Sequence, residues 1–216
     1  MNLLQKIKIY LRNRGKYSFI SKLDFNARIL DVGCGNRSPE AILLLRPDLK
    51  YTGIDIEKIN HLSSVNYETL VARPEKFHIA IESIDGLFDA IISSHNLEHC
   101  NYPEQVMKSM LTKLKPLGMI YISFPSEHTV DLPSRRGTLN FYDDNSHKLP
   151  INLVKFMNDL NETSEIVFYT KKYKPKFLWL IGGVFEPLAK LFNFNLPFGA
   201  TWAYYGFETI IWAKKR

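Results

Sequence analysis

Short apolar runs alternate with helical patterns between residues 27 and 125, and this alternation limits the possible fold more than any other feature of the chain. Helical patterns at residues 38–45, 74–83 and 103–114 separate the runs. Repetition of strand, helix and strand builds a parallel sheet with helices on both faces. We therefore predict a doubly wound α/β fold, with its first strands at residues 27–32, 50–56, 67–71, 88–93 and 119–124.

A glycine turn follows the first expected strand and marks a ligand site. Gly33 and Gly35 let the backbone bend sharply and approach a ligand without side chains in the way. Asp55 ends the second strand, where a carboxylate can accept hydrogen bonds from both ribose hydroxyls. Because ligands of such sheets bind outside the carboxyl ends of the strands, we predict a nucleoside-containing cofactor at this turn.

Two residues near the turn separate the cofactor classes. A dinucleotide-binding turn has a third glycine at the position that Ser38 occupies here. Asp31, just before the turn, suits an ammonium or sulfonium group better than a pyrophosphate. The residues favour a cationic cofactor, and a nicotinamide-binding oxidoreductase of related fold is the alternative.

Four segments, in their order and spacing, resemble the motifs of class I S-adenosylmethionine-dependent methyltransferases. They read ILDVGCGN, GIDI, FDAIISSHNLEH and LKPLGMIYISFP. The similarity is to the small-molecule group, including methyltransferases found with bacterial surface-polysaccharide enzymes. It implies S-adenosylmethionine as cofactor and a Rossmann-like, mostly parallel seven-stranded sheet with an antiparallel last strand. Residues 165–169 and 207–213 can supply the last two strands.

The resemblance also implies a set of cofactor-binding residues. Three of them line the methionine part of the cofactor, one holds the ribose, and two lie near the methyl group after the fourth strand. In that order they are Asp31, Gly33 and Gly35, then Asp55, then Ser94 and His95.

Two histidines are candidates for removing a proton from the methyl acceptor. Methyl transfer gains most from alignment, and a hydroxyl acceptor also benefits from a general base, a role that suits histidine near neutral pH. His99 follows the fourth strand, and His147 lies in the long polar loop after the fifth. His147 ends the stretch from Phe141, which is similar to an F-x-D-x-x-H pattern of surface-sugar methyltransferases. The alternative role for either histidine is a backbone hydrogen bond that holds a loop.

A metal site is the other use that the resemblance suggests for this region. Some quinone-pathway relatives bind a divalent metal with the acid and histidine of an L-E-H motif, here Glu98 and His99. Two ligands make a weak case for a metal, so we predict none.

The chain length of 216 residues fits a single domain. We expect a basic amphipathic cap at residues 1–26, a cofactor-binding half at 27–125 and a substrate-side half at 126–216, with an apolar insertion at about 175–198. Cys34 and Cys100 are too few for a disulfide framework, and the first residues do not read as a secretory signal. We therefore expect a cytoplasmic protein.

The net charge of +6 is unevenly distributed along the chain. Residues 1–26 and 165–216 each carry +5, whereas residues 27–164 carry −4. The apolar run at 177–192 follows a basic run. We therefore consider three roles for it: a lid, a homodimer contact, or a peripheral contact with the inner membrane surface. No nucleic acid is expected, because the fourth strand lacks the Pro-Pro-aromatic signature of amino-methylating DNA enzymes.

The sequence thus predicts a methyltransferase that acts on a small molecule, with a sugar or a lipid-linked cell-surface intermediate as the candidate acceptor. Besides the oxidoreductase, the alternative is a non-catalytic protein that keeps the cofactor site without turnover.

Overall fold

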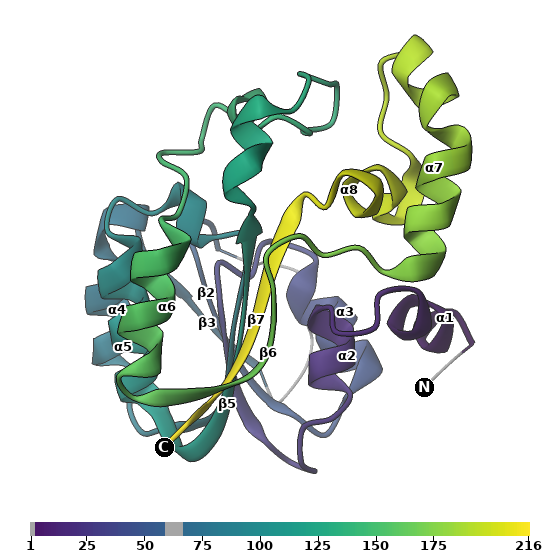
Figure 1. Ribbon diagram of the computed structural model, residues 1–216. Helices are drawn as coiled ribbons and strands as arrows, with labels where there is room; N and C mark the ends of the chain where they lie inside the picture. The colour runs from purple at the N-terminus through teal and green to yellow at the C-terminus, as the bar shows by residue number, and fades with distance from the viewer. Residues whose placement is uncertain (1–2, 59–66) are drawn as a thin grey trace.

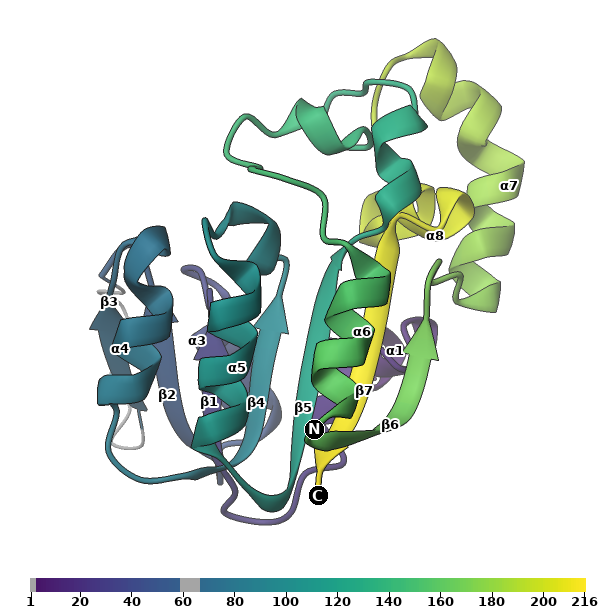
Figure 2. The ribbon, with the colours of Figure 1, turned by 60° about the vertical axis from the view of Figure 1, so that its left-hand side comes forward.

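The computed structural model describes residues 3–58 and 67–216, which form one seven-stranded sheet with helices around it (Figures 1 and 2). The strand order is β3-β2-β1-β4-β5-β7-β6. β7 runs antiparallel to its two neighbours, and the other neighbouring pairs are parallel. This confirms the predicted doubly wound sheet and its antiparallel last strand. The strands are β1 (Arg28–Val32), β2 (Lys50–Asp55), β3 (Tyr67–Val71), β4 (Phe88–Ser94), β5 (Leu114–Pro125), β6 (Ser164–Thr170) and β7 (Glu208–Lys215).

Helices cover both faces of the sheet, as predicted. One face carries α4 (Phe77–Ser83), α5 (Pro103–Lys113) and α6 (Leu153–Asn161), and the other carries α2 (Lys16–Ile20) and α3 (Ser38–Leu45), with α1 (Leu3–Leu11) beside α2 (Figure 1). Each face has its own apolar core. Phe77, Met107 and Phe156 belong to the first core, and Phe19 and Ile42 belong to the second.

Two late parts of the chain stand above the carboxyl ends of the parallel strands. They are the loop of residues 126–152 and the pair formed by α7 (Lys176–Leu191) and α8 (Ala200–Tyr205) (Figures 1 and 2). The second part includes the predicted apolar insertion. None of the described helices is long and apolar enough to cross a bilayer.

The start of β5 differs from the prediction. The strand begins at Leu114 instead of residue 119, directly after α5 ends. Leu114 pairs with Phe88 and Met119 pairs with Ala90, so residues 115–118 form a bulge in which Leu117 has a φ of 63°. Pro and Gly fit such a bulge, because it leaves a residue outside the ladder of hydrogen bonds. The same residues read as a loop when only the apolar run is considered.

Candidate active site

The glycine turn after β1 is tightly packed on one side and open on the other. Gly33 has a φ of 72°, and a Cβ atom built there would lie 2.3 Å from the side chain of Asn96. Gly35 has a φ of 59°, and a Cβ atom there would meet nothing within 4 Å. A side chain is therefore excluded at Gly33 by packing, whereas the backbone at Gly35 borders open space that a ligand can enter.

Asp55 fastens the end of β2 to this turn. Its Oδ2 accepts a hydrogen bond of 2.6 Å from the Gly35 amide, and its Oδ1 accepts one of 2.8 Å from the Ile56 amide. The side chain is only partly buried, and each carboxylate oxygen has two lone pairs, so Asp55 keeps acceptor capacity for a hydroxyl. Its contact with a ribose stays a prediction.

Asp31 lies beneath the turn and is fully buried. Its Oδ2 accepts hydrogen bonds from Ser38 Oγ at 2.5 Å and from the Tyr51 hydroxyl at 3.0 Å. Its Oδ1 is buried and has no hydrogen-bond partner among the residues that the structure describes. Lys16 Nζ donates to Ser38 Oγ at 2.9 Å. The site therefore has a carboxylate oxygen free to accept and an ammonium nearby, which suits a ligand that carries both an amino and a carboxylate group.

His95, predicted beside the reacting methyl group, lies at the centre of a charged network. Its Nε2 donates to Glu208 Oε1 at 2.9 Å, and its Nδ1 donates to Glu98 Oε1 at 3.2 Å. Its ring contacts the rings of Trp202 and Phe207, with centroids 5.2 and 6.1 Å away. Glu208 also forms an ion pair with Arg12. This network joins the end of β4 to the beginning of β7 and to the N-terminal segment.

The network fixes the charge of His95. Burial lowers the pKa of His95, but the hydrogen bonds and charges of Glu208 and Glu98 outweigh burial and raise the pKa to about 9. Burial raises the pKa of Glu208, whereas the charges and hydrogen bonds of Arg12 and His95 lower it to about 2. His95 is therefore an imidazolium at neutral pH and cannot accept a proton from a substrate. Both of its N–H groups already donate to Glu208 and Glu98, so His95 holds the end of β4 in place and has no donor left for a substrate.

A cavity of about 180 Å³ opens beside this network. Five parts of the chain supply its walls: the N-terminal segment, the end of β4 with the loop after it, β5, α8 and β7. The lining residues include both predicted residues of β4 and the loop after it, and they are Arg12, Gly15, Lys16, Tyr17, Ser94, His95, Tyr121, Trp202 and Glu208. Ser94 Oγ is also hydrogen-bonded to Ser123 Oγ at 3.1 Å.

The two histidines predicted as general bases lie side by side, with ring centroids 4.8 Å apart. His147 Nδ1 donates to the Phe141 carbonyl at 2.6 Å, so a neutral His147 has its lone pair on Nε2. His99 Nδ1 is hydrogen-bonded to Ser146 Oγ at 2.9 Å. Each histidine therefore also has the loop-holding contact that was the alternative to a catalytic role.

Glu98 completes a cluster with these histidines. Glu98, His99 and His147 each offer one ligand atom, and the three atoms lie within 4.8 Å of one another. Two imidazoles and one carboxylate form a donor set that suits a divalent metal. The prediction of no metal rested on two ligands, and the structure adds His147 as a third donor.

Asp143 explains the similarity around His147 in structural terms. Its carboxylate accepts hydrogen bonds from Ser134 Oγ and from the backbone amides of Arg135, Leu139 and Asn140. Burial raises the pKa of Asp143, but these bonds lower it below its ordinary value. Asp143, the acid of the F-x-D-x-x-H-like stretch, thus stabilises the conformation of the loop that carries His147.

Four residues at the site were not predicted from the sequence: Arg12, Lys16, Trp202 and Glu208. Only Glu208 has a local signal, since an acid at the first position of an otherwise apolar strand is unusual and asks for a partner. The other three reach the site through the tertiary fold.

Comparisons with known proteins agree with this geometry. A family model described as a methyltransferase domain matches residues 7–158. A protein of Methanocaldococcus jannaschii is 30% identical over 118 residues, which are 47% of this chain and 29% of that protein. The ubiquinone biosynthesis O-methyltransferase of Chromobacterium violaceum is 31% identical over 101 residues, 44% of this chain and 43% of that enzyme. The chain thus spans less than half the length of these curated relatives.

A solved structure extends the similarity to nearly the whole chain. The crystal structure of a SAM-dependent methyltransferase from Archaeoglobus fulgidus matches with a TM-score of 0.59 and 18% identity, covering 98% of this chain and 94% of that one. At this identity the match concerns the fold.

Proposed function

The chain belongs to the methyltransferase domain family, whose cofactor is S-adenosylmethionine, and we propose that it transfers a methyl group from this cofactor to a small-molecule acceptor. The observation that carries the proposal is the pairing of a free buried carboxylate oxygen on Asp31 with the Lys16 ammonium beside an open glycine turn. A dinucleotide has no amino acid part whose amino and carboxylate groups could pair with these two opposite charges. The oxidoreductase alternative therefore lacks support.

Each part of the turn has a role in the proposal. Asp31 accepts from the amino group of the methionine part, and Lys16 pairs with its carboxylate. Gly35 keeps a side chain away from the cofactor, Gly33 lets the turn pack against Asn96, and Asp55 accepts from the ribose hydroxyls. When bound, the sulfonium supplies the methyl group and a good leaving group.

The cavity beside His95 is the proposed acceptor site. Its volume of about 180 Å³ equals roughly six water molecules, which is room for one small ring. Ser94 lines it and orients a polar acceptor there, the His95 ring forms part of the wall, and Trp202 and Tyr121 supply aromatic walls. That a relative is named an O-methyltransferase supports oxygen as the accepting atom.

A hydroxyl acceptor needs a group that takes its proton, and we assign this to His147 or His99. Both lie next to Glu98, which His95 contacts, so Glu98 and the cavity wall at His95 separate them from the cavity. The proposal extends to a sugar or lipid-linked acceptor and to a peripheral membrane contact. The acidic middle and basic ends of the chain support a neutral acceptor and an anionic surface.

Calorimetric titration with S-adenosylmethionine and S-adenosylhomocysteine, with NADH as the control, tests the cofactor. We expect micromolar affinity for the first two and no heat from NADH. Heat from NADH alone would instead support the oxidoreductase alternative. The non-catalytic alternative would be favoured if S-adenosylmethionine binds but no S-adenosylhomocysteine is formed with any of the acceptors tested. These acceptors are a catechol, a sugar nucleotide and a lipid-linked sugar.

A further inference from the structure

The outward face of α7 is apolar along the whole helix. Phe177, Leu180, Val184, Leu188 and Leu191 recur every three or four residues, and each is more than half exposed. The opposite face packs against α8, and both views show α7 on the outside of α8 (Figures 1 and 2). An exposed apolar stripe of this length indicates a binding surface. Because α8 lines the acceptor cavity and α7 lies beyond it, this stripe faces away from the cavity.

No negative charge lies on this outward face of α7. Glu186 is the helix's single acid, and it is buried and pairs with Arg135 at 2.7 Å. Arg135 is buried in the same pair. The remaining charged residues of the helix are Lys176 and Lys190. The outward face is therefore apolar and carries no acid, and the two lysines lie in the first and last turns of the helix.

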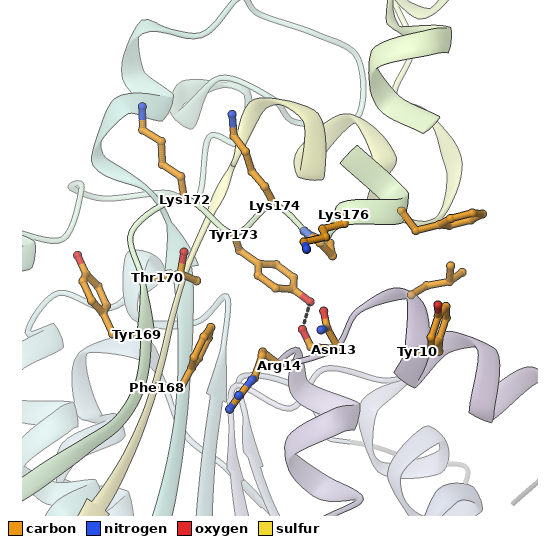
Figure 3. A pocket seen from close by; sticks show the side chains of 13 residues that line it. Tyr10, Asn13, Arg14, Phe168, Tyr169, Thr170, Lys172, Tyr173, Lys174 and Lys176 are labelled. Carbon is orange, nitrogen blue, oxygen red and sulfur yellow. Dashed lines mark hydrogen bonds between the residues drawn. The ribbon is translucent and has the colours of Figure 1, made fainter. Parts of the chain in front are cut away.

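A basic groove of about 700 Å³ opens where α7 begins, between α1 and the segment from β6 to α7 (Figure 3). Four cations line it, and its lining includes no acid: the cations are Arg14, Lys172, Lys174 and Lys176. Lys172 and Lys174 point in the same direction in Figure 3, and Tyr173 points inward, where its hydroxyl donates to the Asn13 carbonyl.

The cations of the groove are not neutralised by the protein. Among the described residues, no carboxylate forms an ion pair with the three lysines or with Arg14. Arg14 instead lies over the ring of Phe168, at 4.8 Å from its centroid. Tyr10, at the rim, is 79% exposed. Unpaired cations and aromatic rings beside an apolar helix face match the phosphates and acyl chains of a lipid surface.

We propose that the outward face of α7 and the basic groove form one docking surface for a bilayer that contains anionic phospholipid. The helix lies in the interface with its apolar stripe among the acyl chains, and the groove cations contact lipid phosphates. The 16 residues of α7 suit a helix that lies on a membrane. This docking surface rests on one part of the proposed function, the peripheral membrane contact. It specifies which residues make that contact and that the lipid is anionic.

A second copy of the chain is a weaker occupant. A two-fold contact through α7 would bring the same basic groove of each copy towards the shared interface, where like charges repel. Anionic lipid turns those charges into an attraction.

Vesicle flotation of the full chain at low salt tests the proposal. We expect binding to phosphatidylcholine vesicles with one third phosphatidylglycerol, and roughly tenfold weaker binding to phosphatidylcholine alone. The triple variant Lys172→Glu/Lys174→Glu/Lys176→Glu should lose binding by roughly tenfold or more. The control Lys50→Glu/Lys76→Glu/Lys108→Glu makes the same charge change at exposed lysines outside the groove and should keep binding. Leu180→Gln/Leu188→Gln should lose binding and keep the charge.

Three results would overturn the proposal. They are no binding to anionic vesicles, equal loss in the control triple variant, and a dimer in light scattering that Leu180→Gln/Leu188→Gln dissociates. Calorimetry with S-adenosylmethionine on every variant shows that it is folded and separates the two proposals. Cofactor binding without vesicle binding refutes the docking surface and the membrane contact but leaves the proposed methyl transfer intact, whereas vesicle binding without cofactor binding refutes the proposed methyl transfer alone.

Discussion

His95 combines a backbone conformation that few residues adopt with a charge that two carboxylates stabilise. Its φ is 52°, a region in which Asn and Gly are the residues most easily accommodated. Its ring lies between two carboxylates, and one of these also pairs with Arg12. The histidine is therefore held in one place and in one protonation state, which gives the cavity a fixed wall.

We expect the stability of the fold to depend on the charge of His95. Its pKa of about 9 in the folded protein exceeds the ordinary value near 6.5, so its contribution is complete below about pH 6.5 and is lost as the pH rises through 9. From pH 7 to pH 10 the wild-type free energy of unfolding should fall by on the order of 2 kcal/mol more than that of His95→Asn. Asn tolerates the positive φ, and denaturant titrations measure both proteins. Parallel pH curves would show that His95 is not charged at neutral pH.

Asp55 should control cofactor affinity. Asp55→Ala removes the proposed acceptor of the ribose hydroxyls and one anchor of the Gly35 amide, so S-adenosylmethionine should bind roughly tenfold to hundredfold more weakly in calorimetry. Asp85→Ala is the matched control, since Asp85 is exposed before β4 at the opposite edge of the sheet. Unchanged affinity in Asp55→Ala would mean that the cofactor lies elsewhere.

His147 and His99 should affect turnover without affecting cofactor binding. If one of them takes the proton, its Ala variant should lose on the order of a hundredfold in kcat at saturating cofactor, and activity should no longer fall at low pH. His78→Ala, on α4, is the control. A loss of folding in place of a loss of kcat would assign the histidine to the hydrogen bond that holds its loop.

The elements of the cofactor half follow from local patterns, and those of the substrate half do so only in part. β1, β2 and β4 lie within one residue of the predicted bounds, because a buried parallel strand reads as an apolar run. α8 and the bulge in β5 could not be predicted, because they depend on packing between distant segments. The same holds within the site: Asp31, Gly33 and Asp55 belong to one local pattern, whereas Glu208 meets His95 across 113 positions of sequence.

Substituting either glycine of the turn should lower the stability of the fold, but for a different reason at each position. Gly33→Ala adds a Cβ that overlaps Asn96 in addition to the strain of a positive φ, and should cost about 2–4 kcal/mol of stability. Gly35→Ala adds only the strain, about 1–2 kcal/mol. Thermal and denaturant unfolding measure both. Asn96→Ala should recover part of the loss in Gly33→Ala and none in Gly35→Ala, and equal recovery in both would contradict the packing role of Gly33.

The molecule as a whole is closed by contacts between its first and last segments. Arg12 pairs with Glu208, and Trp212 Nε1 donates to the Arg14 carbonyl at 3.0 Å. The N-terminal cap therefore packs on the strand that is inserted between β5 and β6. The pair of Arg12 and Glu208 also lines the acceptor cavity.

Arg12→Met should cost about 2 kcal/mol of unfolding free energy, less than the full loss of a buried pair because His95 still faces Glu208. Adding Glu208→Gln should cost less than the separate losses combined, and a double-mutant cycle by denaturant unfolding measures this coupling. Arg136→Met, at an exposed arginine, should change stability by less than about 0.5 kcal/mol. Additive losses at Arg12 and Glu208 would show that they do not interact.

The position of β7 also sets a time order for biosynthesis. Every other strand leaves the ribosome before β7, yet β6 has no neighbour in the sheet until β7 enters beside β5. Arg12 is synthesised long before its partner Glu208, because 196 positions separate them. A nascent chain can therefore form the glycine turn early, but it lacks a wall of its acceptor cavity until the final strand is made, and we expect no methylation before that moment.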